Sequence, residues 1–288
     1  MIDLFNPTQT RALLTRHGFH FSKSKGQNFL TARWVPEQIA EQADIDESCG
    51  VLEIGPGIGA LTQELCRHAG KVVAVEVDRS LAPILAETLD GFENLEIFWQ
   101  DVLKLDLAAL VAEQFPGLRP VACANLPYYI TSPILSRLLE AGCFESITTM
   151  VQKEVAQRIC AEAGSPNYSA FTVFCNYHAV PELLFDVPPS CFVPQPKVTS
   201  AVIRLTARRE PVCEIADEAL FFRVVKAGFS QRRKTLTNCL VSGFSRFSKQ
   251  ELAQLLQDCG FDPSVRAETL DIGAFARIAN ELYERMQV

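Results

Sequence analysis

Residues 51–62 read VLEIGPGIGALT, an apolar strand-like run that leads into three closely spaced glycines and then into a helical pattern. Glycines at such a turn let the backbone bend sharply and let a ligand approach the main chain closely. The spacing is GxGxG, preceded by Glu53, whereas nicotinamide-binding proteins use GxGxxG. The stretch therefore predicts a strand, loop and helix that bind a nucleoside-like ligand, and its spacing disfavours a nicotinamide dehydrogenase.

Strand-like and helical patterns alternate along the chain around this stretch. The expected strands are 51–54, 71–77, 95–99, 120–124 and 147–152, and the expected helices between them are 58–68, 79–89, 107–115 and 133–140. This rhythm predicts an α/β fold, a Rossmann-like parallel sheet with helices on both faces. Two further runs, 183–187 and 198–205, are expected to complete the sheet as a hairpin.

The pattern changes beyond residue 205. Helical periodicity at 219–228, 252–259 and 272–286, with no convincing strand, predicts a small all-helical C-terminal domain. A boundary near Arg208 divides the chain into an expected catalytic domain, 1–208, and a helical domain, 209–288.

The composition, 48% hydrophobic and 21% charged, is typical of a globular protein. No apolar run reaches the length of a membrane span and no signal peptide is recognisable, so we expect a cytoplasmic protein without membrane contact. The ten cysteines form no CxxC pair, and the four histidines complete no metal spacing. We therefore expect reduced cysteines that serve as small hydrophobic residues, and no bound metal.

The charge distribution is more informative than the net charge of −7. Residues 37–118 contain 16 acidic and 4 basic side chains. In contrast, residues 4–36 contain 5 basic side chains and residues 221–250 contain 7, and neither segment contains an acidic residue. Two acid-free basic segments favour a polyanionic partner such as a nucleic acid.

Polar residues follow successive expected strands. Gly55 and Gly57 follow the first strand, Glu76 ends the second, and Asp101 follows the third. The carboxyl ends of parallel strands meet at one edge of the sheet, where such folds bind ligands, and a carboxylate at the second strand tip can accept both ribose hydroxyls. A nucleoside cofactor without the nicotinamide spacing suggests S-adenosylmethionine, whose methyl group needs only a well-placed nucleophile.

The fourth expected strand ends in Asn125-Leu126-Pro127-Tyr128. An exocyclic base amine such as adenine N6 suits this stretch, because the Asn125 carbonyl and a main-chain carbonyl held by Pro127 can accept its two hydrogens. Tyr128 can stack on the base. The base must leave its helix to reach such a site, so the pattern predicts flipped or unpaired RNA or DNA as the substrate.

With these residues identified, the chain resembles the adenosine N6,N6-dimethyltransferases of ribosomal RNA. The resemblance covers about residues 25–270 and is carried by EIGPGIGALT, the Asn-Leu-Pro-Tyr tetrad and five further stretches. These are KGQNFL (25–30), MVQKEVAQRI (150–159), FVPQPKVTSAVIRL (192–205), GFSQRRKTLTNCL (228–240) and SVRAETL (264–270), and they resemble the bacterial small-subunit branch of the family.

The resemblance implies roles for further residues. Asn28 and Leu30 would close over the cofactor, which Gly55, Glu76, Asp101 and Asn125 would bind. Phe192 would sandwich the target base opposite Tyr128. Four basic side chains would bind RNA phosphates: Lys197 in the expected catalytic domain, and Arg232, Arg233 and Lys234 in the expected helical domain.

The resemblance implies a monomeric enzyme that dimethylates two adjacent adenosines near the 3′ end of 16S rRNA in the assembling 30S subunit. Two alternatives stay open. One is the related dimethylation of 23S rRNA that confers macrolide resistance, and the other is a non-catalytic RNA-binding factor on the same fold.

Overall fold

The structure is a computed structural model that describes residues 3–19 and 27–287. The chain forms two compact units, one of Met1–Ala156 with Pro181–Ala207 and one of Gln157–Val180 with Arg208–Val288. The second unit thus includes 157–180 in addition to the C-terminal helices. The division of catalysis and RNA binding between two domains stays a prediction, and Lys25 and Gly26 of the KGQNFL stretch lie outside the described residues.

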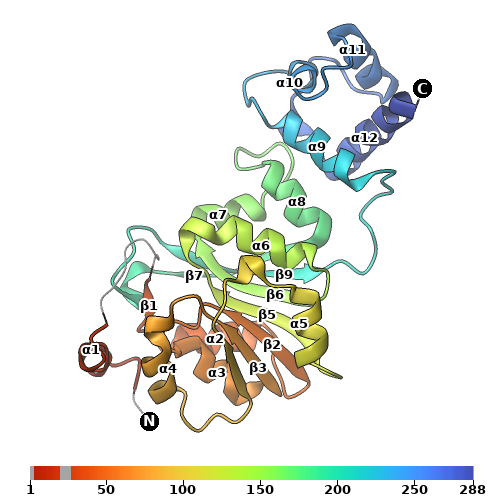
Figure 1. The fold of residues 1–288 in the computed structure, drawn as a ribbon. Coiled ribbons are helices and arrows are strands. Elements are labelled where there is room, and N and C mark those ends of the chain that lie inside the picture. Colours follow the sequence, from red (N-terminus) through yellow and green to blue (C-terminus); the bar gives the residue numbers. More distant parts are fainter. Residues whose placement is uncertain (1–2, 20–26, 288) are drawn as a thin grey trace. The chain divides into compact units, whose positions relative to one another are not determined.

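A seven-stranded sheet with the strand order β4-β3-β2-β5-β6-β9-β7 organises the fold (Figure 1). Strands β2 to β6 are parallel to one another, and β9 runs antiparallel to β6. Their bounds are β2 (Cys49–Ile54), β3 (Lys71–Val75), β4 (Leu95–Phe98), β5 (Arg119–Asn125), β6 (Ser146–Gln152), β7 (Ala179–Val187) and β9 (Ser200–Ala207). This confirms the predicted α/β fold with a Rossmann-like sheet, including the β7 and β9 runs that complete it.

Both faces of the central strands are covered, which explains why β2 is apolar at every position except Glu53. All six residues of β2 are buried. Val51, Val72 and Val121 share one core with the apolar faces of α2 (Trp34–Gln42), α3 (Ala60–His68) and α4 (Ala82–Thr88). The alternating Leu52 and Val73 are also buried. A parallel sheet buried on both faces shows this pattern. The helices of this part are α1 (Pro7–Arg16), α2 (Trp34–Gln42), α3 (Ala60–His68), α4 (Ala82–Thr88), α5 (Leu107–Gln114), α6 (Thr131–Glu140) and α7 (Lys153–Ile159).

The strand order reverses between β2 and β5. After β2 the chain adds β3 and then β4 on one side of β2, and it then crosses to the other side of β2 to form β5. Loops diverge at such a point and open a crevice at the carboxyl ends of the strands. Beside it lies a two-stranded ribbon, β1 (Phe29–Leu30) with β8 (Phe192–Val193), in which Leu30 pairs with Phe192. Two-residue strands have no periodicity, so the sequence pattern did not predict this ribbon.

The second unit has a helical core of its own. It contains α8 (Ala170–His178), α9 (Glu218–Gly228), α10 (Leu236–Gly243), α11 (Lys249–Asp258) and α12 (Ile272–Gln287). Phe221, Leu240, Leu252 and Phe275 are among its buried residues. The predicted helices at 219–228, 252–259 and 272–286 are confirmed, whereas α8 and α10 were not expected. In the part of the chain that the structure describes, no helix is both long and apolar enough to cross a membrane.

Candidate functional site

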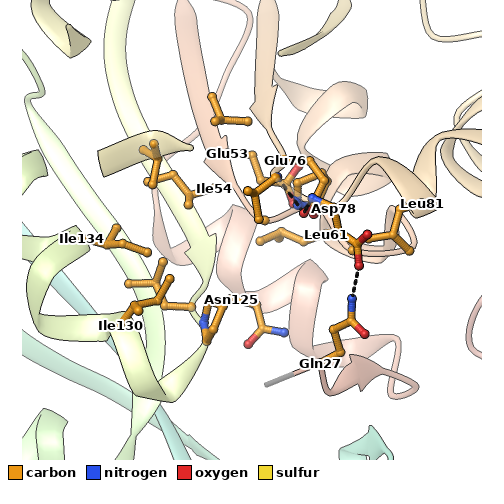
Figure 2. Close-up of a pocket in the computed structure, with 18 of the residues that line it drawn as sticks. Gln27, Glu53, Ile54, Leu61, Glu76, Asp78, Leu81, Asn125, Ile130 and Ile134 are labelled. Atoms are coloured by element: carbon orange, nitrogen blue, oxygen red, sulfur yellow. Dashed lines mark hydrogen bonds between the residues drawn. The ribbon is translucent and has the colours of Figure 1, made fainter. Parts of the chain in front are cut away.

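The crevice at the strand ends holds a cavity that gathers most of the predicted site residues (Figure 2). In the close-up, Glu76 and Asp78 lie toward one end of the cavity and Ile130 and Ile134 toward the other, with Asn125 between them. The predicted residues that line it are Asn28, Leu30, Gly55, Gly57, Glu76, Asp101, Asn125, Leu126, Pro127 and Tyr128. Residues spread over a hundred positions of the chain therefore share one cavity.

The glycine loop needs its glycines for two physical reasons. Gly57 has φ +60°, and a Cβ there would lie 3.2 Å from the Phe29 ring. Gly59 has φ +91° and precedes α3, and a Cβ there would lie 2.9 Å from Leu89 Cδ2. Side chains other than hydrogen strain this backbone conformation, so the loop can keep its path and its close contact with β1 only with glycine.

Glu76 directly follows β3, and backbone N–H groups bind its carboxylate. Its Oε1 accepts hydrogen bonds from the Val77 N–H at 2.9 Å and the Asp78 N–H at 2.8 Å. Burial raises the pKa of this carboxyl, while the backbone donors oppose the change. The main chain thus orients a nearly buried carboxylate whose head lines the cavity, as a group that receives ribose hydroxyls must be oriented.

Asp101 lies shortly after β4, and its carboxylate accepts a hydrogen bond from the backbone of the turn that follows. Its Oδ1 accepts from the Leu103 N–H at 3.1 Å, and its Oδ2 lies 3.8 Å from Lys104 Nζ. It therefore lines the cavity as a turn-forming residue with a partly exposed carboxylate. Local capping and ligand contact are compatible here, because a carboxylate offers about four acceptor positions.

A second carboxyl, Glu53 on β2, lies fully inside the protein beneath the loop. It is 1% exposed, and its Oε2 has no hydrogen-bond partner among the described residues. Burial, with a further contribution from the negative charge of Glu76, raises the pKa of Glu53 to about 8. Glu53 is therefore protonated and neutral near pH 7.

Among the cavity residues that the sequence analysis did not identify are Gln27 and Asp78. Gln27 Nε2 donates to Asp78 Oδ2 at 2.8 Å and so ties the segment before β1 to the end of β3 (Figure 2). Asp78 also accepts from the Ser80 N–H and hydroxyl through Oδ1. The only signal in the sequence was the position of Asp78 two residues after Glu76, which is equally typical of a turn.

Asn125 is held from across the cavity. Its side-chain Nδ2 donates to the Asn28 main-chain carbonyl at 3.4 Å, which leaves its Oδ1 as an acceptor. The Pro127 carbonyl is already used, because it accepts from the Ile130 N–H at 3.2 Å and the Thr131 hydroxyl at 3.1 Å. None of the described residues donates to the Leu126 carbonyl, so Asn125 Oδ1 and Leu126 O are both available as acceptors.

The two aromatic residues expected to sandwich a base differ in exposure. Tyr128 is half-buried and lines the cavity. Phe192 is 1% exposed, pairs with Leu30 in the β1–β8 ribbon, and is absent from the cavity wall formed by the described residues. The structure therefore brings Tyr128 to the cavity and leaves Phe192 in the core beside it.

The expected RNA-binding cations are all exposed. Lys197 lies in the loop between β8 and β9, in the first unit. Arg232, Arg233 and Lys234 lie between α9 and α10, in the second unit. Arg232 donates through its guanidinium to the Pro166 carbonyl, so part of this basic segment is fixed to its own unit. Among the described residues, no group of three or more His, Cys, Asp or Glu side chains is arranged to hold a metal ion.

Comparisons with known proteins agree with this geometry. Residues 18–284 match the family model described as ribosomal RNA adenine dimethylase. The chain is 46% identical over 284 residues to the ribosomal RNA small subunit methyltransferase A of Geobacillus kaustophilus (strain HTA426), with 97% of each chain covered. Among solved structures it is similar to a dimethyladenosine transferase from Plasmodium falciparum (TM-score 0.76, 26% identity, 90% of this chain and 98% of that one). It is also similar to the 23S rRNA methyltransferase ErmE (TM-score 0.68, 29% identity, 89% and 100%).

Proposed function

Because this chain belongs to the ribosomal RNA adenine dimethylase family, we propose that it transfers methyl groups from S-adenosylmethionine to N6 of two adjacent adenosines near the 3′ end of 16S rRNA. The chain is thus a methyltransferase of rRNA adenine. We propose further that the substrate is the assembling 30S subunit, that the enzyme is a cytoplasmic monomer, and that the modification is a step of ribosome biogenesis.

The cavity residues fit S-adenosylmethionine. Gly55 and Gly57 line the cavity with main chain and no side chain, and the oriented Glu76 carboxylate suits a ribose diol. Asp101 suits the adenine amino group, and Asn28 and Leu30 border the cavity from the β1 side. When bound, the cofactor supplies an electrophilic methyl group on a sulfonium, and the protein needs to orient the nucleophile toward it.

The observation that carries the proposal is the pair of free acceptors at Asn125 Oδ1 and Leu126 O. Adenine N6 is a weak nucleophile because its lone pair is delocalised into the ring. Two acceptors that take both amino hydrogens favour a tetrahedral nitrogen, which localises the lone pair. Because the proton becomes acidic only after methylation, this chemistry requires no strong general base.

The remaining residues bind the nucleic acid. Tyr128 stacks on the extruded base, a contact worth roughly 1–3 kcal/mol. For Phe192 to form the opposite wall, its buried ring must become accessible when RNA binds, because only 1% of its surface is exposed. Lys197, Arg232, Arg233 and Lys234 contact phosphates, which positions the RNA without reading its sequence.

Methylation of 23S rRNA is the alternative with an observation in its favour, namely the likeness to ErmE. Identity is higher to the small-subunit enzyme, 46% against 29%, and this supports 16S rRNA. A non-catalytic RNA-binding factor is disfavoured by the complete Asn-Leu-Pro-Tyr tetrad around the cavity.

The test is methyl transfer from radiolabelled S-adenosylmethionine to 30S subunits that lack the modification, beside 50S subunits and free rRNA. We expect label in dimethyladenosine of 16S rRNA in the 30S particles, and no label with Asn125→Ala protein. Label in 23S rRNA would replace the proposal with the alternative, and cofactor binding without any transfer would indicate a binding factor.

A further inference from the structure

Tyr128 shares a short hydrogen bond with a residue that neither the sequence pattern nor the proposed mechanism identified. Its phenol oxygen lies 2.6 Å from the hydroxyl oxygen of Ser200. Ser200 is 0% exposed and is the first residue of β9, whereas Tyr128 is half-buried at the cavity. A buried hydroxyl is normally paired, and this pair satisfies both groups at once.

Both ends of this bond are anchored on the same strand, β6. The Leu126 N–H donates to the Met150 carbonyl at 3.2 Å, which fixes the turn before Tyr128. Two residues further along β6, Gln152 pairs with Ser200 across the antiparallel ladder. The Tyr128–Ser200 bond thus closes a ring of contacts over the end of β6, and its serine side belongs to a rigid sheet.

The bond defines what the phenol can do. Burial raises the pKa of Tyr128, while the bond to Ser200 acts in the opposite direction, so the hydroxyl stays protonated at neutral pH. With its hydroxyl engaged toward β9, the side chain is suited to offer a ring face and unsuited to remove a proton. A tyrosine side chain has two rotatable angles, and fixing them before the base arrives lowers the entropic cost of stacking.

We infer that Ser200 is a positioning residue for methyl transfer: its buried hydroxyl holds the Tyr128 ring in the orientation that stacks on the acceptor base. This inference rests on the proposed function. It places Ser200, the serine of the FVPQPKVTSAV stretch, in the part of the site that binds the methyl-accepting base and not in the part that binds the cofactor. Loss of the hydroxyl therefore weakens use of the RNA and leaves cofactor binding unchanged.

The experiment is a double-mutant cycle with Ser200→Ala, Tyr128→Phe and the double variant, assayed on unmodified 30S subunits. Each single change is expected to lower kcat/KM for the particle by about 3- to 10-fold, the cost of one unfixed side chain. The double variant is expected to be no worse than either single variant, because both remove the same bond. The Kd for S-adenosylmethionine, measured by calorimetry, is expected to stay at the wild-type value.

Thr148→Val is the matched control. Thr148 lies on β6, is 0% exposed, and its hydroxyl has no hydrogen-bond partner among the described residues. Removing this hydroxyl perturbs the same sheet without touching Tyr128, so kcat/KM is expected to stay at the wild-type value. Wild-type kcat/KM for Ser200→Ala, or effects of Ser200→Ala and Tyr128→Phe that multiply in the double variant, would overturn the positioning role.

A second readout needs no RNA. In protein labelled with 13C-tyrosine, the χ1 angle of Tyr128, measured from three-bond couplings, is expected to occupy one rotamer in the wild type and to average between rotamers in Ser200→Ala, because a change of χ1 moves the phenol oxygen away from Ser200. Equal χ1 populations in the two proteins would refute the inference even if the enzyme is active. A wild-type protein that transfers no methyl group would instead refute the proposed function, and the χ1 populations would still decide whether Ser200 fixes Tyr128.

Discussion

Replacement of Glu53 by glutamine is expected to change how the stability of the protein depends on pH. Glu53 is buried beneath the glycine loop, and its pKa is raised from 4.5 to about 8, first by burial and also by the charge of Glu76. The folded protein therefore holds a proton that the unfolded chain releases above pH 4.5. Stability from this proton is fully present below pH 4.5 and is lost as the pH rises to about 8.

The size of the effect follows from the two pKa values. At about 1.4 kcal/mol for each pH unit, the free energy of unfolding falls by about 5 kcal/mol across this window on account of Glu53 alone. Glutamine has the same shape and never ionises, so the variant lacks this loss. Between about pH 5 and pH 8 the melting temperature of Glu53→Gln should rise relative to wild type by about 10 °C.

Thermal unfolding at about pH 5, 6, 7 and 8, followed by circular dichroism, measures the difference between variant and wild type at each pH. Glu113→Gln, an exposed change on α5, is the control and should follow the wild-type curve. A difference between Glu53→Gln and wild type that stays constant over this range would show that Glu53 is ionised in the folded protein. That result would refute the reasoning from burial.

Four further predictions concern the site and the fold. Asn125→Ala should lower methyl transfer by about 10²- to 10³-fold through loss of a preorganised acceptor, measured by label incorporation; an activity within tenfold of wild type would contradict this. Glu76→Gln should weaken S-adenosylmethionine binding by about 10- to 100-fold in calorimetry and leave RNA binding intact. Gly59→Ala should lower the free energy of unfolding by about 1–3 kcal/mol, because its Cβ would lie 2.9 Å from Leu89 at φ +91°; an unchanged urea midpoint would speak against strain. Arg233→Ala should reduce the slope of log K against log salt for rRNA binding by about 1, and an unchanged slope would place Arg233 away from phosphate.

The sequence by itself determined the sheet and the polar residues at its edge. Strands such as β2 and β3 are short apolar runs between turn residues, and this signal is local. The position of a residue at the end of a strand is also local information, so Gly55, Glu76 and Asn125 could be assigned to one cavity from chain order alone. The helices α9, α11 and α12 followed in the same way from their periodicity.

Only the tertiary structure decided which partners orient these residues. Asn125 is held by a carbonyl 97 positions away, Tyr128 by Ser200 72 positions away, and Gln27 by Asp78 51 positions away. Such contacts leave no periodic trace, because they depend on how β1, β6 and β9 are brought together and not on their neighbours in sequence. Burial is decided in the same way: the sequence alone does not say whether Glu53 is exposed, and it is a neutral acid because helices cover both faces of its strand.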